Sequence, residues 1–245
     1  MSGGAVLVLG ARSDIGLAIA HAFAAEGHAI QLAARNPGTL EPARTDLALR
    51  HGVEVTLHRF DALDPAGHET FLDSLPALPE IAVCTVGFMG DQAESETDMA
   101  AARLVMRSNF EGPAGILGLI ANRFEARGSG TIVGISSVAG DRGRATNYVY
   151  GSAKAGFSAW LSGLRNRLAG TGIHVLTVKP GFVATAMTEG MDLPARLTAE
   201  PDAVGRAVLR AVRARRNVIY VKPVWWLVMA VIRAIPEAIF KKMRI

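Results

Sequence analysis

The sequence is poor in cysteine, in aromatic residues and in long apolar runs, and these shortages exclude several classes of protein. Its 245 residues include one cysteine, Cys84, which excludes an internal disulfide and favours a reducing compartment. Cys84 lies in an apolar run at 81–86, so we expect a buried, unreactive thiol. No uninterrupted apolar run reaches the length that a membrane-spanning helix needs.

Neither positive nor negative charge is in large excess. The net charge is +4, and the arginines are spread along the chain without interleaved aromatic residues, so we expect no nucleic-acid binding. The six histidines are scattered, and no His, Cys, Asp and Glu cluster has metal-ligand spacing, so we expect no metal site. The first residues lack the basic start and long apolar region of a secretory signal, which favours a cytoplasmic location.

What the chain does contain is a regular alternation of short apolar runs and longer helical patterns. Strict alternation predicts parallel strands joined by right-handed crossovers, with helices on both faces of the sheet. The fold class is therefore α/β, a single Rossmann-like doubly wound parallel sheet of about seven strands flanked by helices. The predicted strands are 5–9, 28–33, 53–58, 81–85, 130–135, 174–178 and 218–221, and the helices begin near Asp14, Pro37, Pro65, Glu94, Asn109, Asn147 and Pro201. We expect residues 1–223 to form one domain and residues 224–245 to form a tail of the same domain.

Three residues suit chemistry at a carbonyl or alcohol group. Tyr150 and Lys154 are four residues apart on a predicted helix, and Ser137 follows a predicted strand. The positive charge of the lysine should lower the pKa of the tyrosine toward neutrality. The serine hydroxyl could then hold a substrate oxygen while the tyrosine transfers a proton. The alternative is a half-buried core tyrosine and a solvated lysine.

A candidate phosphate-binding loop follows the first strand. Residues 10–16 lead from a glycine at the strand end into a helix, whose N-terminus offers free N–H groups to a pyrophosphate. The alternative is an ordinary strand-to-helix turn. Arg35 ends the second strand where an acidic residue would bind an unphosphorylated ribose. With Arg12 it suits a 2′-phosphate, so NADP(H) is preferred and NAD(H) remains possible, unless both arginines are simply solvated.

These motifs together resemble those of the short-chain dehydrogenase/reductase family, over residues 5–221. The family's Thr-Gly-x-x-x-Gly-x-Gly motif falls on 9–16, its adenine-binding aspartate on Asp61, and its Asn-Asn-Ala-Gly motif on 84–87. Its helical asparagine falls on Asn109, its Tyr-x-x-x-Lys pair on Tyr150 and Lys154, and its Pro-Gly-x-x-x-Thr segment on 180–185.

The resemblance implies a set of site residues. The catalytic group is Asn109, Ser137, Tyr150 and Lys154. The cofactor-binding residues are Gly10, Arg12, Ser13, Ile15, Gly16, Arg35, Asp61, Ala62, Val86, Gly87, Tyr150, Lys154, Pro180, Gly181, Val183 and Thr185. Tyr150 would be the acid in reduction and the base in oxidation, Ser137 would orient the carbonyl, Lys154 would hold the nicotinamide ribose, and Asn109 would steady a water.

The chain departs from the family pattern at two places. Asp14 replaces the middle glycine of the phosphate loop, and we expect its side chain to turn away and to cap the next helix through the N–H groups of Gly16 or Leu17. Cys84 and Thr85 replace both asparagines of the Asn-Asn-Ala-Gly motif. With the segment 86–91 and the apolar tail, this pattern is similar to that of the reductases acting on decaprenylphosphoryl-2-keto-erythro-pentose.

The tail at 224–245 has paired tryptophans, flanking cations and a polar stripe at Arg233, Glu237 and Lys241. Such an amphipathic segment is typical of a peripheral membrane contact, here on the inner face of a membrane. The alternative is a contact in a homodimer or homotetramer, or a cover over the substrate pocket.

The predicted function is an NAD(P)H-dependent oxidoreductase that reduces a carbonyl to an alcohol, on a bulky or lipid-linked small molecule. Two alternatives remain open. One is an NAD-linked alcohol dehydrogenase, and the other is a non-catalytic dinucleotide-binding or assembly protein. The intact Ser137, Tyr150 and Lys154 argue against the second alternative, and the altered residues at 14, 84 and 85 give it its support.

Overall fold

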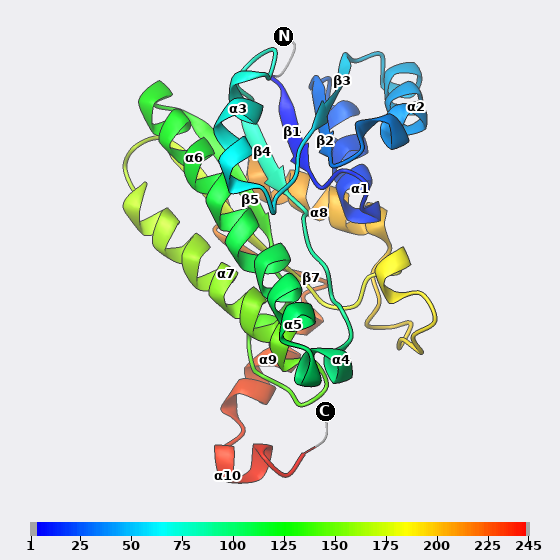
Figure 1. Cartoon of the computed structure of the whole chain (residues 1–245), viewed down its shortest axis with the longest axis vertical. Coiled ribbons are helices and arrows are strands. Elements are labelled where there is room, and N and C mark those ends of the chain that lie inside the picture. Colours follow the sequence, from blue (N-terminus) through cyan, green and yellow to red (C-terminus); the bar gives the residue numbers. More distant parts are fainter. Residues whose placement is uncertain (1–3, 244–245) are drawn as a thin grey trace.

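Seven parallel strands form one sheet at the centre of the molecule (Figure 1). The computed structural model describes residues 4–243. The strand order is β3-β2-β1-β4-β5-β6-β7, so the order reverses between β1 and β4, which are neighbours. The strands are β1 (Val6–Leu9), β2 (Ile30–Ala34), β3 (Val55–Arg59), β4 (Ile81–Cys84), β5 (Gly130–Ile135), β6 (Ile173–Pro180) and β7 (Val218–Val221). The predicted doubly wound α/β fold is confirmed.

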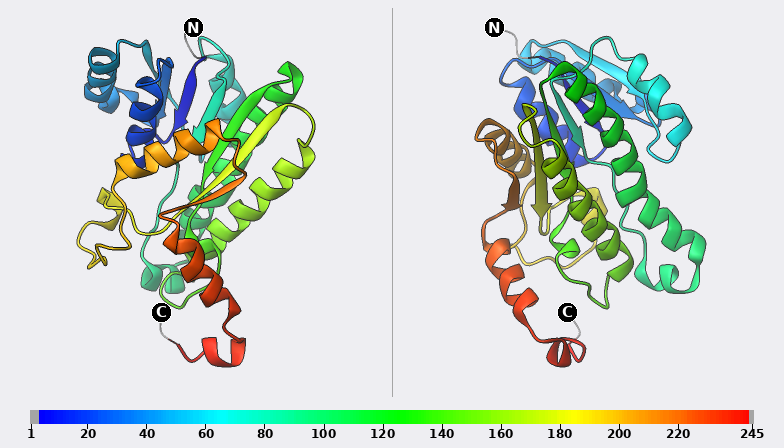
Figure 2. Two further views of the ribbon diagram at one scale, coloured as in Figure 1. Left: turned by 180° about the vertical axis from the view of Figure 1, so that it is seen from behind. Right: turned by 90° about the vertical axis from the view of Figure 1, so that its left-hand side faces the viewer.

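Helices cover both faces of the sheet because successive strand side chains point to opposite faces. Val6 and Val8 belong to a core with α1 and α8, whereas Leu7 and Leu9 belong to a core with α6 and α7. Figure 2 shows α8 lying across one face of the sheet. The helices of these two layers are α1 (Asp14–Ala24), α2 (Glu41–His51), α3 (His68–Asp73), α6 (Gly112–Arg127), α7 (Tyr148–Arg167) and α8 (Pro201–Arg213).

The predicted helix start near Asn109 is wrong. Helix α5 (Met99–Met106) runs through a π-helical turn, η3 (Arg107–Glu111), directly into α6. The cause is local. Pro113 has no N–H and cannot donate the regular bond to the Asn109 carbonyl four residues earlier. The Gly112 N–H instead reaches back to the Arg107 carbonyl, so Asn109 lies within a bulged turn of one long helix.

Short helical segments lie within the connections that follow five of the strands. They are η1 (Pro37–Leu40) before α2, η2 (Pro65–Gly67) before α3, α4 (Gln92–Thr97) after β4, η4 (Val138–Gly140) after β5 and η5 (Ala186–Thr188) after β6. Because β4, β5 and β6 are parallel, the loops that follow them meet at the edge of the sheet where the carboxyl ends of the strands lie.

The C-terminal helices α9 (Val224–Ala234) and α10 (Glu237–Phe240) extend from the end of β7 at the bottom of Figure 1. One side of α9 is buried, with Trp225 and Met229 packed against Val138, Phe182 and Leu197. Among residues 4–243, no helix has both the length and the apolar character needed to span a bilayer.

Candidate active site

Two adjoining cavities lie at the carboxyl ends of the central strands. The larger has a volume of about 650 Å³ and the smaller about 410 Å³. Arg12, Ser13, Thr85 and Gly87 line both cavities, so the two hollows meet at the ends of β1 and β4. This is the point where the strand order reverses, the usual ligand site of an open α/β sheet.

The turn after β1 is held in a tight, glycine-dependent conformation. Gly10 has φ +83°, and a Cβ atom there would lie 2.9 Å from the Val86 backbone nitrogen. Ser13 caps α1, because its Oγ accepts the Gly16 N–H at 3.0 Å. A Cβ at Gly16 would lie 2.9 Å from Ser13 Oγ, so this position is also restricted to glycine.

Thr85 joins this turn to the end of β4. Its Oγ1 lies 3.0 Å from the carbonyl oxygens of both Leu9 and Gly10, to which it donates, and 3.1 Å from Ser13 Oγ. These hydrogen bonds of the Thr85 hydroxyl hold the turn against the end of β4. Thr85 departs from the family motif, but its side chain makes sheet-centre contacts of the kind that steady a phosphate-binding loop.

Asp14 does not cap α1, and this part of the expectation is wrong. Ser13 occupies the capping position, and the Asp14 Oδ2 instead accepts the N–H of Ala186 at 2.9 Å. The carboxylate therefore turns away from the turn, as expected, but toward the loop after β6. It ties the first crossover to a segment 172 residues later.

The smaller cavity carries the predicted adenine-side residues. Its lining includes Gly10, Arg12, Arg35, Asp61, Ala62 and Val86. Asp61 accepts the Leu63 N–H at 2.9 Å, which fixes its loop. Arg12 and Arg35 are exposed and form no hydrogen bond or ion pair with any residue between 4 and 243. Two free guanidinium groups beside one hollow favour an anionic ligand.

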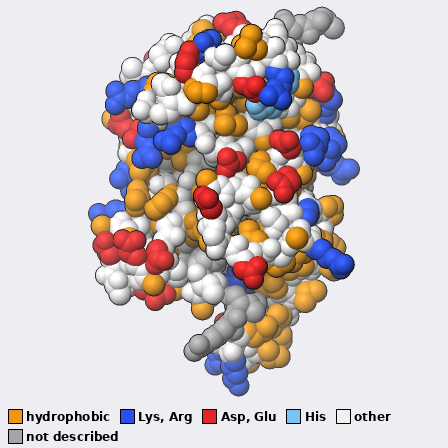
Figure 3. Space-filling model, turned by 90° about the vertical axis from the view of Figure 1, so that its right-hand side faces the viewer, with side chains coloured by type: hydrophobic (Ala, Val, Ile, Leu, Met, Phe, Trp, Pro, Cys, Tyr) orange, Lys and Arg blue, Asp and Glu red, His pale blue; other side chains and the backbone are white. Residues whose placement is uncertain are grey.

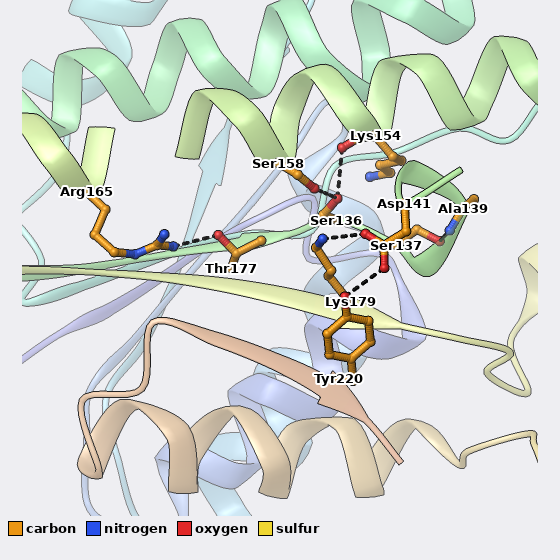
Figure 4. Close-up of polar contacts among 10 residues, drawn as sticks. All are labelled: Ser136, Ser137, Ala139, Asp141, Lys154, Ser158, Arg165, Thr177, Lys179 and Tyr220. Carbon is orange, nitrogen blue, oxygen red and sulfur yellow. Dashed lines mark hydrogen bonds and ion pairs between the residues drawn. The ribbon is translucent and has the colours of Figure 1, made fainter. Parts of the chain in front are cut away.

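Ser137, Tyr150 and Lys154 all line the larger cavity. Ser137 follows β5 in extended conformation, and its Oγ accepts the Ala139 N–H at 3.1 Å. The neighbouring Ser136 is turned into the protein, where its Oγ bonds the Lys154 carbonyl at 3.0 Å and Ser158 Oγ at 2.7 Å (Figure 4). The second serine of the pair is therefore the one free to meet a ligand.

The pKa values of the pair differ from the sequence-based expectation. Burial raises the pKa of Tyr150 to about 12, and its hydrogen bond with Ser137 only partly opposes this. Burial also lowers the pKa of Lys154 to about 8. The lysine is 4% exposed and donates to the Ile135 carbonyl at 3.0 Å. The expectation that Lys154 brings the tyrosine pKa toward neutrality is wrong, because desolvation dominates at both groups.

Asn109 lies behind the cavity, not on its surface. It is fully buried, and its Nδ2 donates to the carbonyls of Phe88 at 2.5 Å and Val105 at 2.8 Å. A Cβ at Gly87 would lie 3.0 Å from Asn109 Oδ1 and 3.4 Å from Lys154 Nζ. The backbone of Gly87 therefore lies between the side-chain amide of Asn109 and the ammonium group of Lys154.

Comparison with known proteins decides the family. The family model described as short chain dehydrogenase matches residues 4–194. The chain belongs to the short-chain dehydrogenase/reductase family. It is therefore an oxidoreductase that uses a nicotinamide dinucleotide, and the family resemblance is confirmed.

Relatives cover nearly the whole chain. An uncharacterized oxidoreductase of Mycobacterium tuberculosis is 37% identical, over 97% of this chain and 96% of the relative. An uncharacterized oxidoreductase of Streptomyces coelicolor is also 37% identical, over 97% and 95%. A short-chain dehydrogenase from Sphingobium yanoikuyae, solved in complex with NADPH, is 26% identical with a TM-score of 0.80, over 96% of this chain and 97% of that one.

The structure brings most of the predicted site residues of this oxidoreductase to the two cavities. The larger is lined by Arg12, Ser13, Ile15, Gly87, Ser137, Tyr150, Lys154, Pro180, Gly181, Val183 and Thr185. Gly16 and Asn109 lie outside the lining of both cavities. Cys84 is buried, as predicted, and burial raises the pKa of its thiol to about 11, which disfavours the reactive thiolate. Residues 4–243 hold no group of three or more possible metal ligands.

Three residues contribute to the site although the sequence did not single out any of them by itself. Arg144 and Asn147 line the larger cavity from the loop between β5 and α7. Trp225 packs against Gly181, and its Nε1 donates to the Leu197 carbonyl at 3.0 Å. A signal was present for Arg144 and Asn147, since both lie in the loop that leads from β5 to the helix of Tyr150. None was present for Trp225, whose contacts join distant segments.

Proposed function

We propose that the protein reduces a carbonyl group to an alcohol with NADP(H). The observation that carries this proposal is the convergence of Ser137, Tyr150 and Lys154 on one cavity that adjoins the turn at residues 10–16. The nicotinamide would supply the hydride. Gly10 and Gly16 fit a dinucleotide, because neither position has space for a Cβ and the turn leads into the N-terminus of α1.

The chain's own residues account for the proton chemistry. A phenol with a pKa of about 12 is protonated at neutral pH, which is the state that a general acid needs for reduction. Ser137 would hold the carbonyl oxygen beside that phenol. Lys154 would hold ribose hydroxyls, and Asn109 would keep the segment after β4 in place and steady a water. A phenol that is protonated at neutral pH supports the proposal of reduction over NAD-linked alcohol oxidation.

The preference for NADP(H) is supported by the two free arginines. Replacing Arg35 by Gln should weaken NADPH binding by about tenfold and leave NADH binding nearly unchanged, because a charge-assisted bond to the 2′-phosphate is lost. Fluorescence titration with both dinucleotides measures this. Arg206→Gln, on the exposed side of α8, is the matched control. Equal losses for both dinucleotides would contradict the preference.

A bulky or lipid-linked substrate is supported by the apolar side chains of the larger cavity. Met89, Val138, Phe182, Met187 and Met191 line it together with the catalytic group. The nicotinamide half of the dinucleotide would fill part of this cavity of about 650 Å³, and the apolar side chains line the remaining part. These residues favour an extended apolar body next to the reacting carbonyl.

Turnover by Tyr150→Phe tests the proposed function. Loss of the general acid should lower kcat by about 10²- to 10⁴-fold in an NADPH oxidation assay with a panel of ketones. The exposed Tyr148 on the same helix provides the control Tyr148→Phe, which should keep its activity. Dinucleotide binding without turnover in the wild type would favour the non-catalytic alternative.

The exposed side of α9 is proposed as a contact with a second copy of the chain. Trp226, Leu227 and Val231 are more than half exposed, at 61%, 57% and 58%. Figure 3 shows hydrophobic side chains gathered at the lower end of the molecule, near lysine and arginine side chains. An apolar patch of this kind is typical of an interface.

Light scattering of Trp226→Glu tests this contact. The substitution should lower the molar mass of the assembly in solution. Vesicle co-sedimentation of the same variant examines the alternative, a peripheral membrane contact of residues 224–245. A point variant is preferred to truncation at Pro223, because truncation would also remove the buried Trp225 from the site.

A further inference from the structure

Arg144 is a cavity-lining arginine without a partner. Its Nε is buried and makes no hydrogen bond, and its guanidinium forms no ion pair with any residue between 4 and 243. Burial lowers its pKa, and no neighbouring charge contributes. Arg142, two residues earlier, shows the usual arrangement, because it bonds the Ile235 carbonyl at 2.9 Å and Glu237 at 2.7 Å.

A partly buried, unpaired guanidinium is unfavourable unless a ligand supplies hydrogen-bond acceptors and negative charge. Buried polar groups are almost always hydrogen-bonded, and buried charges are paired. A second such atom lies nearby, since Asn147 Oδ1 is also buried without a partner and lines the same cavity. The structure thus leaves one donor group and one acceptor atom unsatisfied in the loop just before Tyr150.

The acidic residues of the same cavity do not serve Arg144. Asp14 accepts the Ala186 N–H at 2.9 Å, and Asp91 accepts the Glu94 N–H at 2.8 Å as the cap of α4. Neither carboxylate forms an ion pair within the described residues. The positive charge of Arg144 is therefore available to a ligand in the cavity.

Arg144 also lies apart from the proposed phosphate-binding turn. It belongs to the loop after β5, whereas that turn follows β1, and β4 lies between these two strands. Arg144 shares the larger cavity with Ser137 and Tyr150 but is absent from the lining of the smaller one. Arg144 therefore lines the cavity of the catalytic group and not the cavity of the predicted adenine-side residues.

We propose that Arg144 binds an anionic group of the substrate, a carboxylate or a phosphate, and that Asn147 accepts a hydrogen bond from a hydroxyl or amide of the same molecule. The proposal rests on the proposed carbonyl reduction and narrows its substrate class. A planar guanidinium suits two-oxygen recognition of either anion. With the apolar lining, the substrate is an amphiphilic ketone with an anionic group near the carbonyl.

Matched pairs of ketones test the proposal. One pair is 3-oxodecanoate and its methyl ester, and the other is dihydroxyacetone phosphate and dihydroxyacetone. Calorimetric binding is measured on protein saturated with NADP⁺, which blocks the cofactor's own phosphate sites and carries no hydride to transfer to the ketone. We expect the wild type to bind at least one anionic ketone about 10- to 100-fold more tightly than its neutral partner. The pair that shows the preference separates carboxylate from phosphate.

Arg144→Gln should abolish that preference by weakening only the anionic ligand, while Arg144→Lys should keep part of it. Arg206→Gln, outside both cavities, should behave as the wild type. Equal affinity of the wild type for the charged and neutral members of both pairs would overturn the proposal. So would an unchanged preference in both Arg144 variants. Binding is read without turnover, so loss of NADPH oxidation alone would count against the proposed reduction and not against this site.

Discussion

The ammonium group of Lys154 lies 5.7 Å from the centre of the Tyr150 ring and donates to the Ile135 carbonyl, at 3.0 Å. The two functional groups are thus neighbours without direct proton sharing. Each is shifted by burial toward its neutral form, the phenol upward and the ammonium downward in pKa. The lysine, not the tyrosine, is the group that titrates near physiological pH.

The pH dependence of turnover should therefore follow Lys154. With a pKa of about 8, the lysine is charged below that pH and neutral above it. We expect kcat/KM for NADPH, which reports the free enzyme, to be constant between about pH 6 and pH 7 and to fall above about pH 8. A profile that stays flat to pH 10 would contradict this assignment.

Lys154→Met should stabilise the fold in a pH-dependent way. The lowered pKa means that the unfolded chain binds the proton more tightly, so the native protein is penalised fully below about pH 8 and not at all above the unfolded pKa. The pH-dependent part of the increase in the free energy of unfolding is about 3 kcal/mol. Urea unfolding of the variant and the wild type at pH 6.5 and pH 10.5 measures this increase. An increase of equal size at both pH values would refute a buried charge at Lys154.

Thr85→Val should weaken dinucleotide binding. The valine keeps the shape but removes the hydroxyl that bonds Leu9, Gly10 and Ser13, so the turn loses its support. We expect a Kd for NADPH that is raised by about tenfold. Thr85→Ser keeps the hydroxyl and serves as the control. Wild-type affinity in the valine variant would show that the turn is held by its backbone alone.

Arg142→Ala should release α10 and the end of α9. The guanidinium donates to the carbonyls of Arg233 at 3.1 Å and Ile235 at 2.9 Å, and it lies 4.0 Å from the centre of the Phe240 ring. Trypsin should then cut at Lys241 or Lys242 at least several times faster than in the wild type. Arg206→Ala is the control, and unchanged cleavage would mean that packing alone holds the tail.

Local patterns in the sequence were sufficient for the sheet. The apolar runs at 81–85 and 130–135 became neighbouring central strands, because runs buried on both faces have a clear composition. The spacing of Tyr150 and Lys154 likewise placed both side chains at one cavity. Helix α7 carries them at the expected four-residue interval.

Properties that depend on distant partners could not be predicted. The Asp14 carboxylate bonds Ala186, which is remote in sequence, and the pKa of Lys154 depends on the depth of its burial. The π-helical turn at Asn109 was missed although Pro113 is a local cause, since a proline after Gly112 more often marks a helix start. The unpaired state of Arg144 is visible only when all its neighbours are known.

Trp225 and Trp226 are consecutive residues of α9 with opposite surroundings. The first packs against Gly181 and Phe182 in the segment predicted to meet the nicotinamide, whereas the second faces solvent at 61% exposure. If a second copy of the chain contacts Trp226, as proposed, a shift of α9 on association would also shift Trp225. Subunit association and cofactor affinity would then be linked, and each would change the other by the same factor.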